Sequence, residues 1–112
     1  MREYIVRVTP AAISDIEELA NFYLELVDEE SAARFSADVL ETIESLDTFP
    51  EGNAYFDEKH GLRRALLKHH KVSVVYLVDG NVYEVIAFGA FHTSGRPNKY
   101  TKELIKRLKE LR

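Results

Sequence analysis

The segment that most constrains the fold is an apolar hairpin in the second half of this 112-residue chain. Residues 72–78 are mostly β-branched, aromatic or aliphatic and are apolar at both alternating sets of positions, which is typical of a strand buried on both faces. Asp79, Gly80 and Asn81 follow, and glycine and asparagine tolerate the positive φ of a tight turn. Residues 82–91 return as a second strand. The chain is therefore expected to contain a central antiparallel pair that other elements cover.

A third strand is predicted before this hairpin. Residues 62–67 read as a strand, and the polar turn His69–Lys71 joins them to the hairpin. The small residues Ala87, Gly89 and Ala90 in the last strand indicate close packing or a bend. Because the connections are short, the three strands are expected to form an antiparallel meander.

The chain begins with a predicted strand over residues 4–8, followed by an amphipathic helix. Thr9 can cap this helix. Pro10 suits its first position, because an N–H at that position would have no intrahelical acceptor and proline has none to leave unpaired. The predicted buried stripe consists of Ile13, Ile16, Ala20, Tyr23 and Val27. The opposite face is predicted to be acidic and carries Asp15, Glu17, Glu18 and Glu25.

A second helix is predicted to start at a Ser31 cap and to stop at Phe49 and Pro50, since proline disfavours helix at the preceding residue. Its apolar stripe consists of Phe35, Val39, Ile43 and Leu46, supported by Ala32 and Leu40. The short connection between the helices favours an antiparallel helical hairpin. Residues 51–61 show no periodicity and are predicted to form a loop.

The C-terminal segment is predicted to be a loop over residues 94–98 and a basic helix over residues 100–112. The helix is apolar at Leu104, Ile105, Leu108 and Leu111. A helix this short is marginal alone in water, so we expect it to dock. The predicted fold is α+β, with the order β-α-α-β-β-β-α: a helical hairpin packed on a small antiparallel sheet, plus a basic C-terminal helix. One domain, residues 1–112, accounts for the chain, and the N-terminal strand either forms an edge or joins the meander.

Composition excludes several classes of protein. The chain has no cysteine, which excludes disulfides, thiolate chemistry and Cys-ligated zinc. No apolar run approaches the roughly 20 residues of a membrane span, and the N-terminus lacks the apolar core of a signal peptide. These features predict a small soluble, cytoplasmic domain.

The net charge of −4 conceals a division along the chain. Residues 1–58 carry 15 acidic and 3 basic residues, whereas residues 59–112 carry 12 basic and 4 acidic residues and all 4 histidines. Such asymmetry indicates a polyanionic partner or an interaction surface. The alternative is that the helices simply happen to be acidic and the strands basic.

Several motifs, each weak alone, occur in a characteristic order along nearly the whole chain. They are the Thr-Pro-Ala-Ala that starts at Thr9, Asp15 with Ile16, Ala33, Phe35, Leu40, Ile43, Leu46, Phe49 with Pro50, Gly52, Gly61 to Arg64, Tyr76, Val78 to Gly80, and His92 before Arg96 and Pro97. In this order and spacing, the chain resembles the RelE/ParE superfamily of toxins from type II toxin–antitoxin modules, also called plasmid stabilisation proteins. The resemblance implies two N-terminal helices on a small antiparallel sheet. It also implies a cognate antitoxin whose C-terminal segment wraps the toxin.

The resemblance implies one of two activities. RelE-like members cleave mRNA in the ribosomal A site without metal, whereas ParE-like members are not nucleases and poison DNA gyrase. Cleavage requires groups that accept the 2′-OH proton, stabilise the pentavalent phosphate and protonate the leaving oxygen. The candidate catalytic residues for it are His92, Arg63, Arg64 and Arg96. RelE-like enzymes usually carry an arginine at the position that is Ser73 here, and some carry another at the position nearest to Gly89, so the resemblance is nearer to ParE.

Further candidates are expected to bind an antitoxin or target: Lys68, Lys71, Lys99, Tyr100, Lys102 and Lys106. Since Arg63 and Arg64 are adjacent on a strand, one of them must face outward. His92 is either a proton-transfer group or a structural histidine that bonds the loop after it.

No cofactor and no metal site is predicted. His69 and His70 are adjacent and would point to opposite faces of a strand. His60 lies in a loop with Asp57 and Glu58, which is a weak signal for a metal.

The sequence leaves three hypotheses. The first is a ParE-like toxin that inhibits an essential process, DNA gyrase and replication above all, by protein contact. The second is a ribosome-dependent, metal-free mRNA endonuclease on the same scaffold. The third is a non-toxic homologue that only binds a partner. No membrane partner is predicted.

Overall fold

The computed structural model describes residues 3–93 and 97–111, and for residues 97–99 the backbone alone. Its elements, in order, are β1 (Ile5–Val8), α1 (Pro10–Leu26), α2 (Glu29–Ser45), a 3₁₀ turn (Pro50–Gly52), β2 (Tyr55–Asp57), a second 3₁₀ turn (Glu58–His60), β3 (Leu62–Leu66), β4 (Val72–Asp79), β5 (Glu84–His92) and α3 (Pro97–Glu110). The predicted α+β class is confirmed, and the predicted elements occur in the predicted order, with β2 as an added strand. Among the described residues, no helix is long and apolar enough to cross a membrane.

The strands form one five-stranded sheet in the order β1-β5-β4-β3-β2. The β3–β4–β5 meander is antiparallel as predicted, and β1 is an edge strand that pairs parallel to β5, which makes the sheet mixed. The prediction of a plain loop over residues 51–61 is wrong, because Tyr55–Asp57 pairs with β3 at the other edge. Three residues are too few to show an alternating pattern.

Three predicted element boundaries differ from those in the structure. The turn between β4 and β5 spans residues 80–83, and Tyr83 takes φ 52°. Helix α3 begins at Pro97, inside the predicted loop, because proline suits the first helical position. Asp28, and not Ser31, caps α2: its Oδ1 accepts the backbone N–H of Ser31 at 2.7 Å. The predicted cap of α1 is confirmed, since Thr9 Oγ1 accepts the N–H of Ala12.

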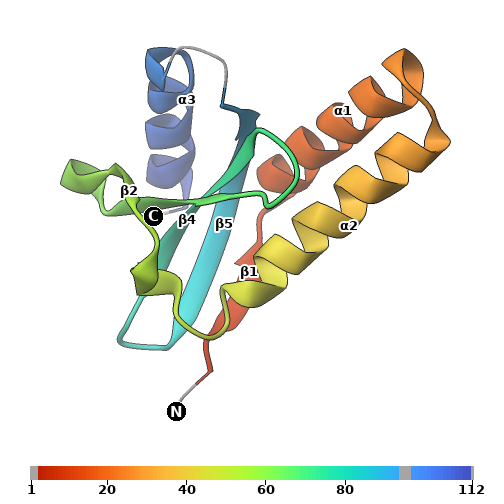
Figure 1. Cartoon of the computed structure of the whole chain (residues 1–112). Helices are drawn as coiled ribbons and strands as arrows, with labels where there is room; N and C mark the ends of the chain where they lie inside the picture. Colours follow the sequence, from red (N-terminus) through yellow and green to blue (C-terminus); the bar gives the residue numbers. More distant parts are fainter. Residues whose placement is uncertain (1–2, 94–96, 112) are drawn as a thin grey trace.

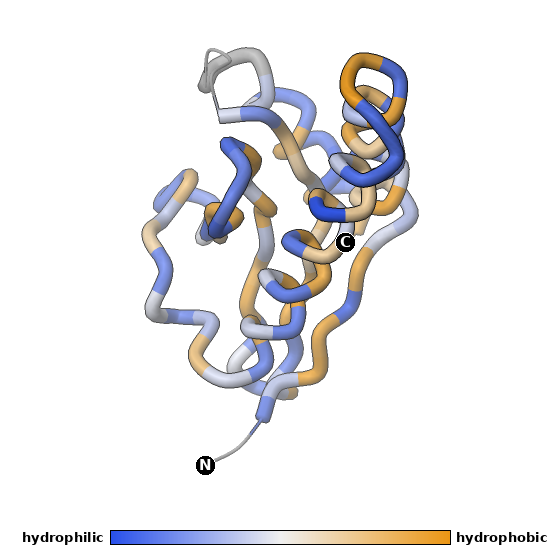
Figure 2. The backbone as a smooth tube through the Cα atoms, turned by 45° about the vertical axis from the view of Figure 1, so that its right-hand side comes forward, coloured by the Kyte–Doolittle hydropathy of each residue, from blue (hydrophilic) through white to orange (hydrophobic). Residues whose placement is uncertain are grey.

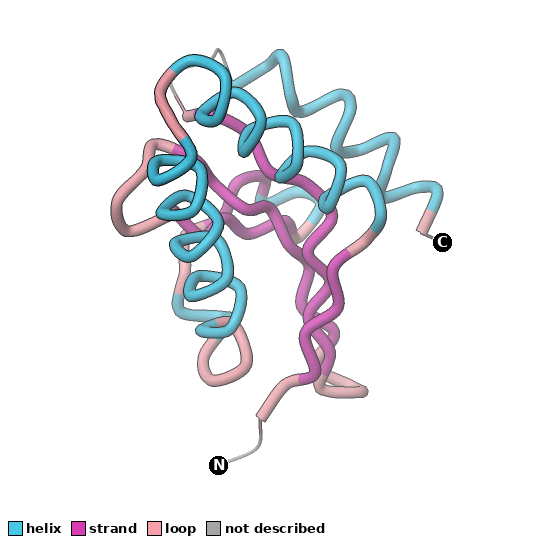
Figure 3. Tube along the Cα trace, turned by 90° about the vertical axis from the view of Figure 1, so that its right-hand side faces the viewer, coloured by secondary structure: helices cyan, strands magenta, loops and turns pink. Residues whose placement is uncertain are grey.

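The helical hairpin covers one face of the sheet, and α3 lies on the other (Figure 1). Figure 3 shows the same arrangement with the hairpin toward the viewer and α3 behind the strands. The core beneath the hairpin contains Phe35, Val39, Leu46, Val74 and Tyr76, all buried. Along the helices, hydrophilic and hydrophobic residues alternate (Figure 2), as expected for elements with one buried face.

Some residues at the margins of the predicted stripes are exposed. Ile13, Val27, Leu40 and Leu111 were assigned to buried faces, yet each is exposed. In α1 the buried residue is Ala12, with Ile16, Leu19, Ala20 and Tyr23 packed against the core. The buried stripe of α1 is therefore rotated relative to the prediction, toward the side that carries Asp15.

Helix α3 docks on the second face of the sheet, as predicted. Leu104 and Leu108 are buried against Phe88 and Phe91 of β5. A Cβ built on Gly89 would clash with Leu104 Cδ2, so a larger residue at this position would require the Leu104 side chain or α3 to shift. The predicted close packing at this glycine is confirmed.

Candidate functional site

The site that the fold assembles is the open edge of β5. Strand β1 pairs with residues 84–87 of β5 and stops, and the Thr9 N–H then donates to Ala87 O at 2.9 Å where the chain turns into α1. Beyond this point, Ala90 N–H and Phe88 O lack a neighbouring strand on that side. Unpaired strand edges invite pairing with other chains, so folded proteins usually protect them.

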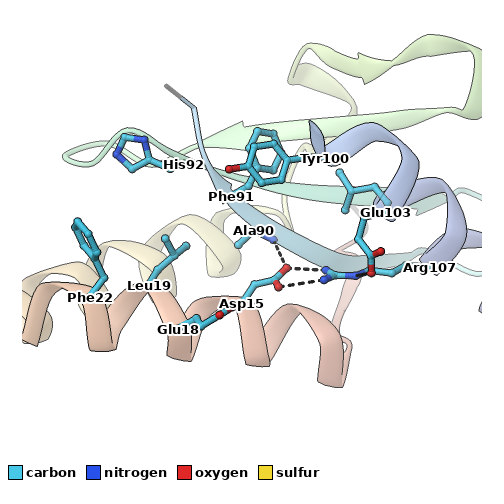
Figure 4. Close-up of a pocket in the computed structure, with 11 residues that line it drawn as sticks. Asp15, Glu18, Leu19, Phe22, Ala90, Phe91, His92, Tyr100, Glu103 and Arg107 are labelled. Atoms are coloured by element: carbon cyan, nitrogen blue, oxygen red, sulfur yellow. Dashed lines mark hydrogen bonds and ion pairs between the residues drawn. The ribbon is translucent and has the colours of Figure 1, made fainter. Parts of the chain in front are cut away.

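Two side chains take the place of the missing strand. Asp15 Oδ2, from α1, accepts the Ala90 N–H at 3.0 Å, and Arg107 Nη1, from α3, donates to Phe88 O at 3.1 Å. The same two side chains form a bidentate ion pair with N···O distances of 2.6 and 3.1 Å (Figure 4). We call the Asp15–Arg107 pair and its two backbone contacts the edge clasp. It fastens both helical layers to β5.

The electrostatics of the edge clasp follow from its geometry. Each of its two side chains is 18% exposed. The hydrogen bond from Arg107 to Asp15 raises the pKa of the guanidinium, and this effect outweighs the opposing effect of desolvation. Arg107 Nε also lies 3.3 Å from Glu103, on the same helix. Arg107 is thus a fixed, fully neutralised cation.

Local sequence reasoning missed the clasp, although a signal existed. Arg107 lies three residues after Leu104 and one before Leu108, so a charge interrupts the apolar stripe of α3. Asp15 directly precedes Ile16, on the same side of α1 as Ala12. A charged residue on each of two apolar stripes is a signature of a buried pair, but the sequence alone does not show which charges meet.

An open groove of about 580 Å³ runs alongside the clasp, between α1 and α3. Helix α1 lines it with Glu18, Leu19 and Phe22, and Figure 4 shows Leu19 and Phe22 pointing from α1 toward β5. The opposite wall consists of Phe91, His92, Tyr100 and Glu103. The Tyr100 ring stacks on Phe91, with centroids 4.5 Å apart and an interplanar angle of 20°. The groove therefore combines aromatic walls with carboxylates.

The four candidate catalytic residues do not gather at one place. His92 is half-buried at the end of β5 and lines the groove. Arg96 lies outside the described residues. Arg63 points to the loop before β3, where it donates to Asn53 O at 2.7 Å and Tyr55 Oη at 3.0 Å and lies 4.0 Å over the Tyr55 ring. Arg64, its neighbour, is exposed.

The two positions where RelE-like enzymes carry arginine are filled by packing. Ser73, on β4, is 1% exposed and lies opposite Phe91 of β5 and Leu66 of β3. Gly89 has Leu104 in the space that a side chain would need. A large side chain at position 89 would therefore meet Leu104 of α3, and one at position 73 would have to enter a buried part of the sheet.

The candidate partner-binding residues fall on two separate elements. Lys68 and Lys71 are exposed in the turn between β3 and β4, and Lys102 and Lys106 are exposed on α3. Tyr100 belongs to the aromatic wall described above, and the side chain of Lys99 lies outside the described residues.

A buried carboxylate shapes the turn that presents Lys68 and Lys71. Asp38, on α2, is 3% exposed and accepts the backbone N–H groups of Lys68 at 3.2 Å and His69 at 2.8 Å, with His70 Nδ1 at 2.7 Å. Burial acts to raise the pKa of Asp38, but these three hydrogen bonds together outweigh it and lower the pKa. This residue was not singled out from the sequence, where one acid among many on a helix carries no signal.

The histidines do not form a metal cluster within the described part of the chain, where no group of three metal-binding side chains occurs. His60 Nδ1 lies 2.8 Å from Asp57 Oδ2, so this pair is satisfied locally.

A comparison with known protein families shows which family this chain matches. The sequence profile of a family described as the ParE toxin of type II toxin–antitoxin systems, parDE, matches residues 6–90, more than half of the chain. The chain belongs to the ParE toxin family. The match ends at Ala90, so α3 and Arg107 lie outside it. No curated protein sequence matches the chain at a significant level.

Two solved structures share this architecture. The chromosomal ParDE toxin–antitoxin system of P. aeruginosa matches with a TM-score of 0.69 at 21% identity, covering 80% of this chain and 95% of that one. The toxin–antitoxin complex RelBE2 of Mycobacterium tuberculosis matches with a TM-score of 0.59 at 20% identity, covering 85% and 97%. At these identities the likeness concerns the fold. The family match over residues 6–90 confirms the resemblance to the RelE/ParE superfamily that the sequence predicts, and the two structures agree with it in fold.

Proposed function

We propose that this ParE-family toxin acts in the cytoplasm without catalysis, inhibiting DNA gyrase and hence replication by protein–protein contact, and that a cognate antitoxin neutralises it. The observation that carries the proposal is the packing at positions 73 and 89. Of the two positions where RelE-like nucleases usually or sometimes carry arginine, Ser73 is buried and Gly89 lies against Leu104 of α3, so neither presents a cation to a substrate.

The remaining cations also argue against a phosphate-binding centre. The Arg63 guanidinium donates hydrogen bonds to Asn53 O and Tyr55 Oη, and Arg107 is neutralised by Asp15. Where His92 lines the groove, Glu18 and Glu103 line it too, and carboxylates repel a phosphodiester. The exposed lysines on the β3–β4 turn and on α3 are better suited to contacts with an acidic protein surface.

Induced expression in bacterial cells tests this proposal. We expect DNA synthesis to stop first, with filamentation and induction of the SOS response, while amino-acid incorporation continues. Co-expression of the cognate antitoxin should abolish the effect. Rapid loss of protein synthesis with mRNA cuts at the A site would instead identify a nuclease, and the absence of any growth effect would identify a non-toxic homologue.

Substitutions then separate catalysis from contact. His92→Ala should retain antitoxin binding and toxicity, because no proton transfer is required. Paired charge reversals at Lys68 and Lys71, and separately at Lys102 and Lys106, should reveal which basic surface meets the target. The two pairs are matched, since all four lysines are exposed and each pair carries the same charge. If neither pair changes toxicity in folded protein, basic contact with the target is refuted.

A further inference from the structure

The groove between α1 and α3 is lined by aromatic side chains and carboxylates, and it differs in this from the surfaces that carry the exposed lysines. Its walls are aromatic: Phe22 of α1 is 52% exposed, and Tyr100 lies flat on Phe91 across from it. Exposed apolar surface that is gathered in one place and rimmed by polar residues marks a binding site more often than a single exposed side chain does. The groove is partly open to solvent, so a side chain of another molecule can enter it. Figure 4 shows the side chains that line it.

The charge in this groove is negative. Asp15 and Arg107 neutralise each other, which leaves Glu18 on α1 and Glu103 on α3. Glu103 is 55% exposed and shares Arg107 with Asp15 through a single 3.3 Å contact. In the described part of the chain, no basic side chain forms an ion pair with the exposed Glu18. Among the described side chains, Glu18 and Glu103 therefore flank the aromatic walls, and Arg107, which Asp15 already neutralises, is the only Lys or Arg that lines the groove.

We propose that this groove binds an arginine side chain on a segment of a partner protein. The aliphatic stem would lie on Leu19 and Phe22, and the guanidinium would face Tyr100 and the carboxylates of Glu18 and Glu103. Aromatic faces attract cations, and a guanidinium adds planar stacking and several donors that match carboxylates. The charge complementarity that selects a cation also rejects an acidic segment or a phosphodiester.

This assignment goes beyond the proposed function and does not depend on it. The edge clasp holds the groove together, because it fixes α1 and α3 on either side of β5. The groove can therefore be probed on the purified chain, whatever the cellular target is.

The test is a titration of the full-length, ¹⁵N-labelled chain with two capped tripeptides, Gly-Arg-Gly and Gly-citrulline-Gly, followed by NMR. Citrulline has the shape of arginine and no charge. We expect saturable shifts of the Leu19, Phe22 and Tyr100 amides with the arginine peptide and none with citrulline. Binding should weaken as ionic strength rises, since exposed charges are screened.

Variants on α1 and α3 separate specific from general attraction. Glu18→Gln with Glu103→Gln should weaken arginine-peptide binding about 3- to 10-fold, because each exposed charge pair contributes roughly 1.5- to 5-fold. The matched control, Glu17→Gln with Glu25→Gln, removes the same charge from exposed positions on α1 that do not line the groove, and should change binding less than about twofold. Phe22→Ala should also weaken binding, and its large exposed fraction makes the substitution safe for folding.

Three results would overturn the proposal. One is equal binding of the arginine and citrulline peptides. Another is equal weakening by the groove pair and the control pair. The third is self-association of the chain that the groove substitutions abolish, which would assign the groove to a second copy instead of a partner segment. Unchanged melting temperatures and amide spectra for the variants establish that any loss of binding is local.

Discussion

The edge clasp predicts a specific loss of stability when Asp15 is replaced by asparagine. The substitution keeps the size of the side chain and an oxygen for the Ala90 N–H, but it leaves Arg107 with a neutral partner at 18% exposure. Breaking a fully buried pair costs about 3–5 kcal/mol, and a hydrogen bond to a charged group contributes about 1.5–3 kcal/mol. Because this pair keeps some contact with solvent, we expect a loss of about 1.5–3 kcal/mol in the free energy of unfolding.

The assay is urea denaturation of the wild type, Asp15→Asn, Arg107→Met and the double variant. A loss of this size corresponds to a fall in Tm of about 6–12 °C for a domain of this length. The double variant should lose less than the sum of the singles, with a coupling of about 1–2 kcal/mol, because it leaves no unpaired charge at positions 15 and 107. Hydrogen exchange at the Ala90 amide should accelerate in Arg107→Met, since the clasp there loosens.

Glu103→Gln serves as the control for this cycle. Its carboxylate is 55% exposed and touches Arg107 by one 3.3 Å contact, so its removal should cost less than about 0.5 kcal/mol. A loss below about 0.5 kcal/mol in Asp15→Asn, or strictly additive single variants, would refute the role assigned to the clasp.

Three further predictions concern single elements. Gly89→Ala should lower the free energy of unfolding by about 1–3 kcal/mol in thermal denaturation, since its Cβ would clash with Leu104. The control is Gly80→Ala, whose Cβ would have no neighbouring atom within 4 Å. Equal losses in the two variants would contradict the close packing of Gly89 against α3. Thr9→Ala should cost about 1 kcal/mol by loss of the α1 cap, whereas Ser31→Ala, which caps nothing with its side chain, should not. Asp38 has a pKa below its ordinary 3.8 in the folded state, so its stabilisation is complete above about pH 4 and is lost as pH falls through the lower folded value. Asp38→Asn should therefore be less stable at neutral pH and show a shallower loss on acidification; parallel pH profiles would refute the assignment.

Local patterns predicted most of the elements because their signals are short-range. The Thr9 cap, the Pro10 start and the double-sided apolar run of β4 each depend on neighbouring residues. The boundary errors are also local: Asp28 and Ser31 are both good caps, and only the geometry of the chain entering α2 selects Asp28.

Local patterns cannot predict which residues pair when they are far apart in the sequence. Asp15 and Arg107 are 92 residues apart, and their meeting depends on β1 ending at Val8 and on Gly89 admitting α3. Strand β5 also contains a β-bulge, which local sequence patterns do not predict. It leaves Phe88 as an extra residue between the Tyr76–Ala87 and Val75–Gly89 pairs. As a result, Ala87 and Ala90, three residues apart, both pack beneath the hairpin, which strict alternation would not predict.

The candidate site was predicted only in part. His92 and Tyr100 were singled out from the sequence, and both line the groove. Of the carboxylates beside them, Glu18 is predicted on the acidic outer face of the first helix and Glu103 is not singled out, because the sequence does not show that α1 and α3 face each other across one strand. The simple division into an acidic and a basic half of the chain therefore breaks down at this groove, where residues from both halves meet.

The central claim is that this ParE-family chain inhibits gyrase by contact and without catalysis. Its most direct test is a DNA supercoiling assay with purified gyrase, with a reconstituted translation reaction run in parallel. The account predicts that the purified chain blocks supercoiling, that His92→Ala blocks it equally, that prior binding of the cognate antitoxin restores it, and that translated mRNA stays intact. Uninhibited gyrase together with mRNA cleavage in the ribosomal A site, lost in His92→Ala, would contradict it.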